Sequence, residues 1–213
     1  MSPHGVFERR AQIRSLGSLP LYFTNQVVVE SSAAIDEQLA ARGVAPVDWD
    51  AVLLSHLDCD HANGLKLVAD AKKILVLKDE LRFAENGSPV NRISYNADWW
   101  RGTKMQTFDW NGLMGPAGRS YDVFGDGMLM MVNIPGHSKG ACARSGSRGR
   151  TGGYADGGYA KKSWEQMLLF GIADDRAAQK KSLAWIRAQS RERNCVACIA
   201  NHDFDVKPGA ITL

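Results

Sequence analysis

One short stretch constrains the fold and the function of this chain more than any other part of its sequence. The apolar segment Asp50–Ser55 predicts a short buried strand. Five residues whose side chains can bind a metal ion come directly after it: His56, Asp58, Cys59, Asp60 and His61. Because ligand sites of α/β folds lie where strands end, the cluster predicts a metal site in the loop that follows this strand.

Two interpretations of this cluster compete. In an extended loop, His56 and Asp58 point to one side while Asp60 and His61 turn toward a second centre, so that one loop serves two metal ions. Cys59 then points away from His56 and Asp58 and packs beside the ligands. In the alternative interpretation the loop is a polar turn, and Asp60 caps the N-terminus of the next helix.

The other histidines show the same placement. The chain has only five histidines. His137 lies in a glycine-bracketed turn after an apolar segment, His202 follows the apolar segment Val196–Ala200, and Asp156 lies in a glycine-rich turn. Each of these residues alone is as well explained by a structural role in its turn. Together, however, every histidine after His4 falls at the predicted end of a strand, which predicts one shared site.

Four separated elements, taken together, resemble the metallo-β-lactamase superfamily of metal-dependent hydrolases. The signature of that superfamily is His-x-His-x-Asp-His, then a Gly-His turn, an Asp in a glycine-rich turn and a final His. The matching segments are Ser55–Leu65, Pro135–Ser138, Ala155–Tyr159 and Asn201–His202. Asp58 stands where the signature has its second His. Within the superfamily the chain looks like the N-acyl homoserine lactonase-like branch, because Tyr159 stands three residues after Asp156.

The resemblance implies a dinuclear site and assigns each candidate ligand to a metal ion. One metal would be held by His56, Asp58 and His137. The other would be held by Asp60, His61 and His202. Asp156 would bridge the two. The resemblance implies two divalent ions, with zinc expected first and iron or manganese as alternatives because Asp58 adds negative charge to the site.

The same resemblance implies hydrolysis of a small-molecule substrate. A hydroxide shared by the two metal ions would attack the carbonyl of a lactone or ester. Asp60 would accept the proton of that hydroxide, and Tyr159 would hydrogen-bond the carbonyl or leaving oxygen; the alternative for Tyr159 is packing before the next helix. Two other functions stay open. One is different chemistry within the superfamily (thioesterase or glyoxalase-like, phosphodiesterase or redox), and the other is a non-catalytic, truncated remnant that binds metal weakly.

Apolar periodicity predicts the remaining elements. Strands are expected at 50–55, 74–77, 121–124, 128–132 and 196–200, and helices at 30–43, 61–71, 161–171 and 174–191. Residues 79–86 are expected to be helical or irregular. Residues 1–26 and 91–120 are expected to be mostly irregular. This alternation is typical of α/β or α+β proteins. The resemblance implies a single α+β domain over residues 1–213, built as an αββα sandwich.

Two segments depart from that sandwich. No strand is expected before residue 26 and no Asp-Thr-Gly occurs, so the resemblance implies an incomplete N-terminal sheet with strands missing. Residues 141–153 are anomalous, because Arg, Ser and Gly dominate their composition. A buried strand made from them would place charges in the core. A flexible loop or an insert is therefore predicted here, as a locally shifted reading frame would produce.

Composition excludes several classes of function. The net charge of +3 over 213 residues is too small and scattered for a nucleic-acid-binding protein. No apolar run reaches the ~18 residues that a membrane span requires. With four cysteines and no secretory signal, the chain is expected in the reducing cytoplasm with free thiols. Its Cys195–Cys198 pair is accordingly expected to be buried rather than redox-active or zinc-binding. The oligomeric state stays open.

Overall fold

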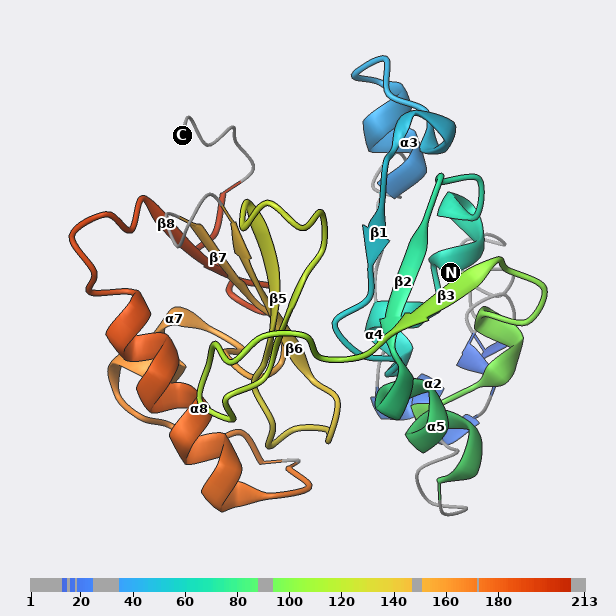
Figure 1. The fold of residues 1–213 in the computed structure, drawn as a ribbon. Helices are drawn as coiled ribbons and strands as arrows, with labels where there is room; N and C mark the ends of the chain where they lie inside the picture. The colour runs from blue at the N-terminus through green and yellow to red at the C-terminus, as the bar shows by residue number, and fades with distance from the viewer. Residues whose placement is uncertain are drawn as a thin grey trace. The chain divides into compact units, whose positions relative to one another are not determined.

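The computed structural model describes residues 13–14, 16–17, 19–24, 35–87, 94–146, 151–171 and 173–207. The chain divides into two compact units, which are described separately (Figure 1). Unit 1 comprises Met1–Val76 and Leu81–Thr107, and unit 2 comprises Leu77–Glu80 and Phe108–Leu213. Among the described residues, no helix combines the length and the apolar character needed to cross a bilayer.

Within the described residues, the first sheet has three strands. β1 (Val52–Leu53) pairs in parallel with β2 (Ile74–Leu77), and β3 (Met105–Phe108) lies on the other side of β2. All four residues of β2 are buried, which explains its continuous apolar sequence. Buried side chains of the surrounding loops and turns complete the core of unit 1, among them Leu57 and Trp99. The strands expected at 50–55 and 74–77 are therefore confirmed, the first in a shorter form.

The helices in the first half of the chain are short. In chain order they are α2 (Leu19–Thr24), α3 (Ile35–Ala40), η1 (Pro46–Asp48), α4 (Cys59–Ala62), η2 (Leu65–Val68), α5 (Lys78–Asn86) and η3 (Ala97–Trp99). The irregular structure expected for 1–26 is wrong at α2, where Leu21 is buried. The helix expected over 61–71 is interrupted at Gly64, which separates α4 from η2. Of the two alternatives for residues 79–86, helical or irregular, the structure shows the helix α5.

The second sheet, in unit 2, has five strands in sequence order. They are β4 (Ser120–Asp122), β5 (Leu129–Asn133), β6 (Cys142–Gly146), β7 (Thr151–Tyr154) and β8 (Ala197–Ala200). The pairs from β4 to β7 are antiparallel, whereas β7 and β8 are parallel, with Gly152 opposite Cys198. Because the last two strands run the same way, their C-terminal ends meet at one edge of the sheet (Figure 1).

Strands β6 and β7 correct the expectation of a loop or insert at 141–153. Cys142, Ala143 and Ser145 are buried, while Arg144 is exposed. The pleat therefore turns the arginine outward and places only small side chains inside, so no charge enters the core. Residues 147–150 lie outside the described part of the chain. An arginine- and glycine-rich composition is thus compatible with an ordinary central strand.

Two helices of unit 2 lie between β7 and β8 in the sequence. α7 (Lys161–Glu165) and α8 (Arg176–Gln189) contact each other, as Figure 1 shows. The N-cap of α8 is Asp175, whose side chain accepts hydrogen bonds from the backbone N–H groups of Ala177 and Ala178. Buried residues of both helices pack with the inner face of the sheet: Trp164, Leu183 and Ile186 against Ile134, Ala143, Tyr154 and Ala200. The helix expected over 174–191 is confirmed.

Candidate metal centre

In unit 1, the loop after β1 and the helix α4 bring two imidazole rings together. The ring centroids of His56 and His61 are 4.0 Å apart. The Oγ atom of Ser55 lies 3.0 Å from Nδ1 of His56 and 3.2 Å from Nδ1 of His61. A histidine whose Nδ1 is held in this way presents Nε2 to a ligand. One serine therefore sets the orientation of both candidate ligands.

The carboxylates of this loop have different positions. Asp58 is the N-cap of α4, and its Oδ1 accepts a hydrogen bond of 2.8 Å from the backbone N–H of Cys59. The alternative that a carboxylate of this loop caps the helix therefore holds, but for Asp58 rather than Asp60. Asp60 lies in the first turn of α4, exposed, with Oδ2 3.7 Å from Nε2 of His61.

Cys59 lies between these two carboxylates, and atoms of the three side chains come within 4.8 Å of one another. Its thiol is buried. Burial, and then the neighbouring charges of Asp58 and Asp60, raise the pKa of Cys59 to about 12. A thiol must lose its proton to bind a metal, so this environment favours the role expected for Cys59, which is packing beside the ligands.

In unit 2, one buried carboxylate faces two imidazoles. Oδ1 of Asp156 lies 3.2 Å from Nε2 of His202, and Oδ2 lies 3.6 Å from Nε2 of His137. Two ligand atoms bound to one ion at ~2.0–2.1 Å in tetrahedral geometry are ~3.3 Å apart. Each oxygen–nitrogen pair is therefore spaced as ligands of a common ion would be, and the donor set of oxygen and imidazole nitrogen suits zinc, iron or manganese.

The parallel pairing of β7 and β8 places Asp156 beside His202, since each residue comes two positions after the end of its strand. Hydrogen bonds hold the two loops together. The backbone N–H of His202 donates to the carbonyl of Tyr159 (3.1 Å), and the Asn201 amide donates to Oδ1 of Asp156 (3.1 Å). One residue further on, Asp203 accepts a hydrogen bond of 2.8 Å from the backbone N–H of Lys161.

The turn that carries His137 is braced by α8. The carbonyl of Gly136 accepts a hydrogen bond from the Asp175 N–H (3.0 Å), and the Ser182 hydroxyl donates to the carbonyl of Pro135 (2.7 Å). Gly136 has a φ of +141°, and a Cβ there would approach the backbone nitrogen of Gln179 to 2.6 Å. Only glycine fits between the helix and this turn, which accounts for the Gly-His pair in the sequence.

Tyr159 has an unusual backbone and a stacked ring. Its φ is +46°, a conformation that bulky residues seldom adopt. Its ring centroid lies 4.3 Å from that of His202 and 4.4 Å from that of Phe170, both in stacked geometry. The packing role is thereby observed, and the hydrogen bond to a substrate oxygen stays a prediction.

The structure adds three residues to those expected from the sequence. Ser55 and Asn201 hold candidate ligands by hydrogen bonds, and Phe170 stacks on Tyr159 and lies 5.7 Å from the His137 ring. Ser55 and Asn201 each stand next to a histidine of the signature, and this position in the sequence is enough to identify them as candidate supporting residues. Phe170 stands far from every motif, and no feature of the sequence points to it.

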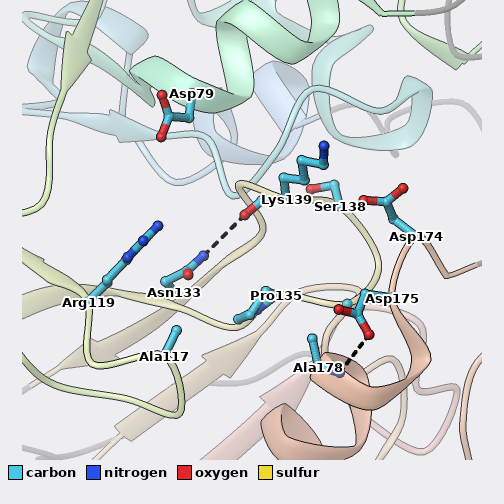
Figure 2. A pocket seen from close by; sticks show the side chains of 11 residues that line it. Asp79, Ala117, Arg119, Asn133, Pro135, Ser138, Lys139, Asp174, Asp175 and Ala178 are labelled. Atoms are coloured by element: carbon cyan, nitrogen blue, oxygen red, sulfur yellow. Dashed lines mark hydrogen bonds between the residues drawn. The ribbon is translucent and has the colours of Figure 1, made fainter.

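A pocket of about 460 Å³ lies in unit 2 beside the His137 turn (Figure 2). Its lining includes residues on both sides of His137 in the sequence, from Pro135 to Lys139, and the start of α8. The Asn133 amide donates to the carbonyl of Lys139 (3.4 Å) at its wall. All the residues expected in the site are described by the structure, and none of them lines this pocket.

Residues 25–90 match the model of the metallo-beta-lactamase superfamily. The chain is similar to this superfamily over that segment. It is 26% identical over 188 residues to the N-acyl homoserine lactonase AttM of Rhizobium radiobacter, which covers 84% of this chain and 67% of that protein. It is 27% identical over 184 residues to the AttM lactonase of Azorhizobium caulinodans, covering 80% and 64%.

Solved structures match the fold of this chain. An N-acyl homoserine lactone hydrolase with N-hexanoyl-L-homoserine bound at its catalytic metal centre superposes with a TM-score of 0.63 at 21% identity, covering 83% of this chain and 65% of that one. AidC, a dizinc quorum-quenching lactonase, matches with a TM-score of 0.62 at 16% identity, covering 84% and 65%. The mixed α+β fold expected from the sequence is confirmed as a metallo-β-lactamase fold. The chain spans about two thirds of the length of these relatives.

Proposed function

We propose that this chain is a metal-dependent hydrolase with a dinuclear centre that opens a lactone or ester. The observation that carries the proposal is the carboxylate of Asp156, whose two oxygens face Nε2 atoms of two different histidines. A carboxylate that bridges two ions needs this arrangement, because each oxygen must share an ion with a different set of ligands. An ordinary buried aspartate needs no such pair of imidazoles.

The proposed ligand sets follow the superfamily signature. One ion takes His56, Asp58 and His137. The second takes Asp60, His61 and His202. Asp156 belongs to both sets. Zinc is the proposed metal, supported by the dizinc lactonase among the structural neighbours; the oxygen of Asp58 in place of an imidazole leaves iron or manganese as the alternatives.

Divalent ions bound by these residues would activate a water molecule near neutral pH and polarise the carbonyl group under attack. The chain's own residues do the rest. The exposed carboxylate of Asp60 accepts the proton released by that water and passes it to solvent. The hydroxyl of Tyr159, whose ring is fixed between His202 and Phe170, donates a hydrogen bond to the carbonyl or leaving oxygen of the substrate.

The proposed substrates are N-acyl homoserine lactones, the compounds for which the AttM relatives are named. A cyclic ester of this kind presents one carbonyl for attack and one ring oxygen as leaving group. Thioesters and phosphodiesters are the comparison substrates, because related chemistry on them would use the same ligands.

Metal analysis and lactone hydrolysis, measured on the purified chain and on Asp156→Ala, test this proposal. We expect about two metal ions per wild-type chain. In Asp156→Ala we expect loss of metal and a fall in hydrolysis of about 100-fold or more, since the residue lost is a ligand and not only its support. The matched control is Asp126→Ala, an exposed aspartate in the β4–β5 turn, which should keep both properties. A wild-type chain that holds less than half an ion, or unchanged hydrolysis in Asp156→Ala, would contradict the proposal.

A further inference from the structure

Two cysteines of unit 2, outside the candidate metal centre, lie in contact. The Sγ atoms of Cys195 and Cys198 are 3.1 Å apart. Cys198 is the second residue of β8, while Cys195 belongs to the turn before that strand. Both residues are half-buried, whereas Cys59 and Cys142 are only 4% and 1% exposed. The buried pair of thiols expected here is therefore more accessible than the other two cysteines of the chain.

We propose that Cys195 and Cys198 form a reversible disulfide by exchange with low-molecular-weight disulfides. A disulfide has an S–S bond of ~2.03–2.05 Å, so the two sulfur atoms need to approach by only about 1 Å. The turn can supply this movement. Cys198 is held by the pairing of β8 with β7, but Cys195 precedes the strand and belongs to a turn, where its N–H donates a hydrogen bond to the carbonyl of Glu192 (3.0 Å).

The reaction balances as two successive exchanges. The Cys195 thiolate attacks one sulfur of the external disulfide and releases one thiolate, leaving a mixed disulfide on the turn. Cys198 then loses its proton to solvent and attacks the Cys195 sulfur, which releases the second external thiolate. Two protein thiols are oxidised, one external disulfide is reduced to two thiols, and no other oxidant is needed.

The surroundings of Cys198 favour this order of events. Its Sγ lies 3.6 Å from the hydroxyl of Tyr154, and it packs against the apolar core of unit 2. Burial raises the pKa of the Cys198 thiol to about 11, so at neutral pH it is protonated and attacks second. Gly152, opposite Cys198 in β7, has no side chain, and this leaves the space that the Tyr154 hydroxyl occupies.

A disulfide between these residues would be a labile modification rather than a structural link. It closes a loop of only four residues, and short loops remove little conformational entropy from the unfolded chain. The disulfide would also constrain β8, the strand that Asn201 and His202 directly follow. It would change the contact of Cys198 with Tyr154, a residue that stands two positions before Asp156.

Redox titration of the full chain tests the proposal. The reduced protein is equilibrated in buffers of reduced and oxidised glutathione, quenched with acid, alkylated, and digested with trypsin. Cleavage after Arg193 leaves both cysteines on one peptide. We expect this peptide to change from a doubly alkylated form to an internal disulfide two hydrogen masses lighter than the dithiol, and to return to the dithiol on reduction. Ring closure should become faster as the pH rises toward 11.

Single variants show whether the partner is required. Cys195→Ser and Cys198→Ser should each stop at a mixed disulfide with glutathione or stay reduced. Cys142→Ser, which removes a buried thiol, should form the internal disulfide as the wild type does. A wild-type peptide that stays a dithiol throughout the oxidising range, or that ends as a glutathione adduct without ring closure, overturns the proposal.

Discussion

The two groups of candidate ligands differ in how far apart their members lie in the sequence. In unit 1, His56 and His61 lie within one segment of six residues, the first in the β1–α4 loop and the second in α4, and they share one serine. In unit 2, His137, Asp156 and His202 come from three loops that the sheet and α8 hold in place. The first group therefore depends on local contacts, and the second on the register and packing of strands distant in sequence. Changes far from any ligand should disturb the second group and spare the first.

The largest expected effect comes from a glycine inside the sheet. In β7, a Cβ on Gly152 would collide with the ring and hydroxyl of Tyr154, a buried and rigid side chain. Gly152→Ala should therefore destabilise the chain by about 1–3 kcal/mol, as overpacking of a filled interior does. Urea unfolding of the metal-free chain measures this. Metal affinity should fall as well, because Tyr154 stands two residues before Asp156.

The neighbouring glycine is the matched control for this prediction. A Cβ on Gly153 would lie 3.4 Å from Nε of Arg144, an exposed and flexible side chain that can move aside. Gly153→Ala should leave stability within about 0.5 kcal/mol of the wild type, or raise it slightly, because alanine restricts the unfolded chain. Equal losses of stability in the two variants would show that the packing of Tyr154 over Gly152 is not what the sheet depends on.

Much of this fold can be predicted from apolar runs, and the exceptions have a physical cause. β2 is recognisable because its four buried residues are large and apolar. β6 is not, because its buried residues are Cys142, Ala143, Ser145 and Gly146. A strand buried through small side chains has little hydrophobic signal of its own, and it is stabilised by pairing with β5 and β7, a pairing that no local pattern identifies. α2 escaped prediction because a helix of six residues has too few positions to show a period.

The candidate site likewise has a part that the sequence predicts and a part that it does not. The order of the motifs predicts which residues belong to it, and the structure brings His56 with His61, and Asp156 with His137 and His202. Supporting contacts such as the stacking of Phe170 on Tyr159 depend on how loops pack, which the motifs do not encode. The cap of α4 falls on Asp58 because the helix begins two residues earlier than predicted.

An effect of intermediate size, on metal affinity, is expected when the residues that hold the ligands of each group by hydrogen bonds are substituted. Ser55→Ala removes the partner of two imidazole Nδ1 atoms, and Asn201→Ala removes the amide that donates to Oδ1 of Asp156. Loss of such supporting hydrogen bonds typically lowers metal affinity about 10–100-fold. Ser55→Ala should lower the affinity for both ions, because His56 and His61 belong to different proposed ligand sets. Asn201→Ala should lower chiefly the affinity for the ion held by His202. Competition with a chromogenic zinc chelator resolves the two affinities.

Two variants that remove similar hydrogen bonds at the surface serve as controls. Ser190→Ala removes a hydroxyl that donates to the carbonyl of Arg187 at the end of α8, and Asn86→Ala removes an amide that donates to the carbonyl of Arg82 in α5. Both should bind metal as the wild type does. If Ser55→Ala changes only one of the two affinities, the assignment of His56 and His61 to different ions is wrong.

The smallest effect is expected from substitutions that separate the two roles of Asp58, as helix cap and as proposed metal ligand. As N-cap of α4 it accepts the Cys59 N–H, and as a proposed ligand it contributes a charged oxygen. In the metal-free chain, Asp58→Ala should lose about 1 kcal/mol of stability, whereas Asp58→Asn should lose clearly less because asparagine caps helices equally well. With zinc present, both variants should bind more weakly than the wild type, since neither keeps the carboxylate. Urea unfolding with and without zinc measures both tasks. Equal losses in the metal-free chain would show that the cap contributes nothing, and unchanged zinc binding in Asp58→Asn would remove Asp58 from the ligand set.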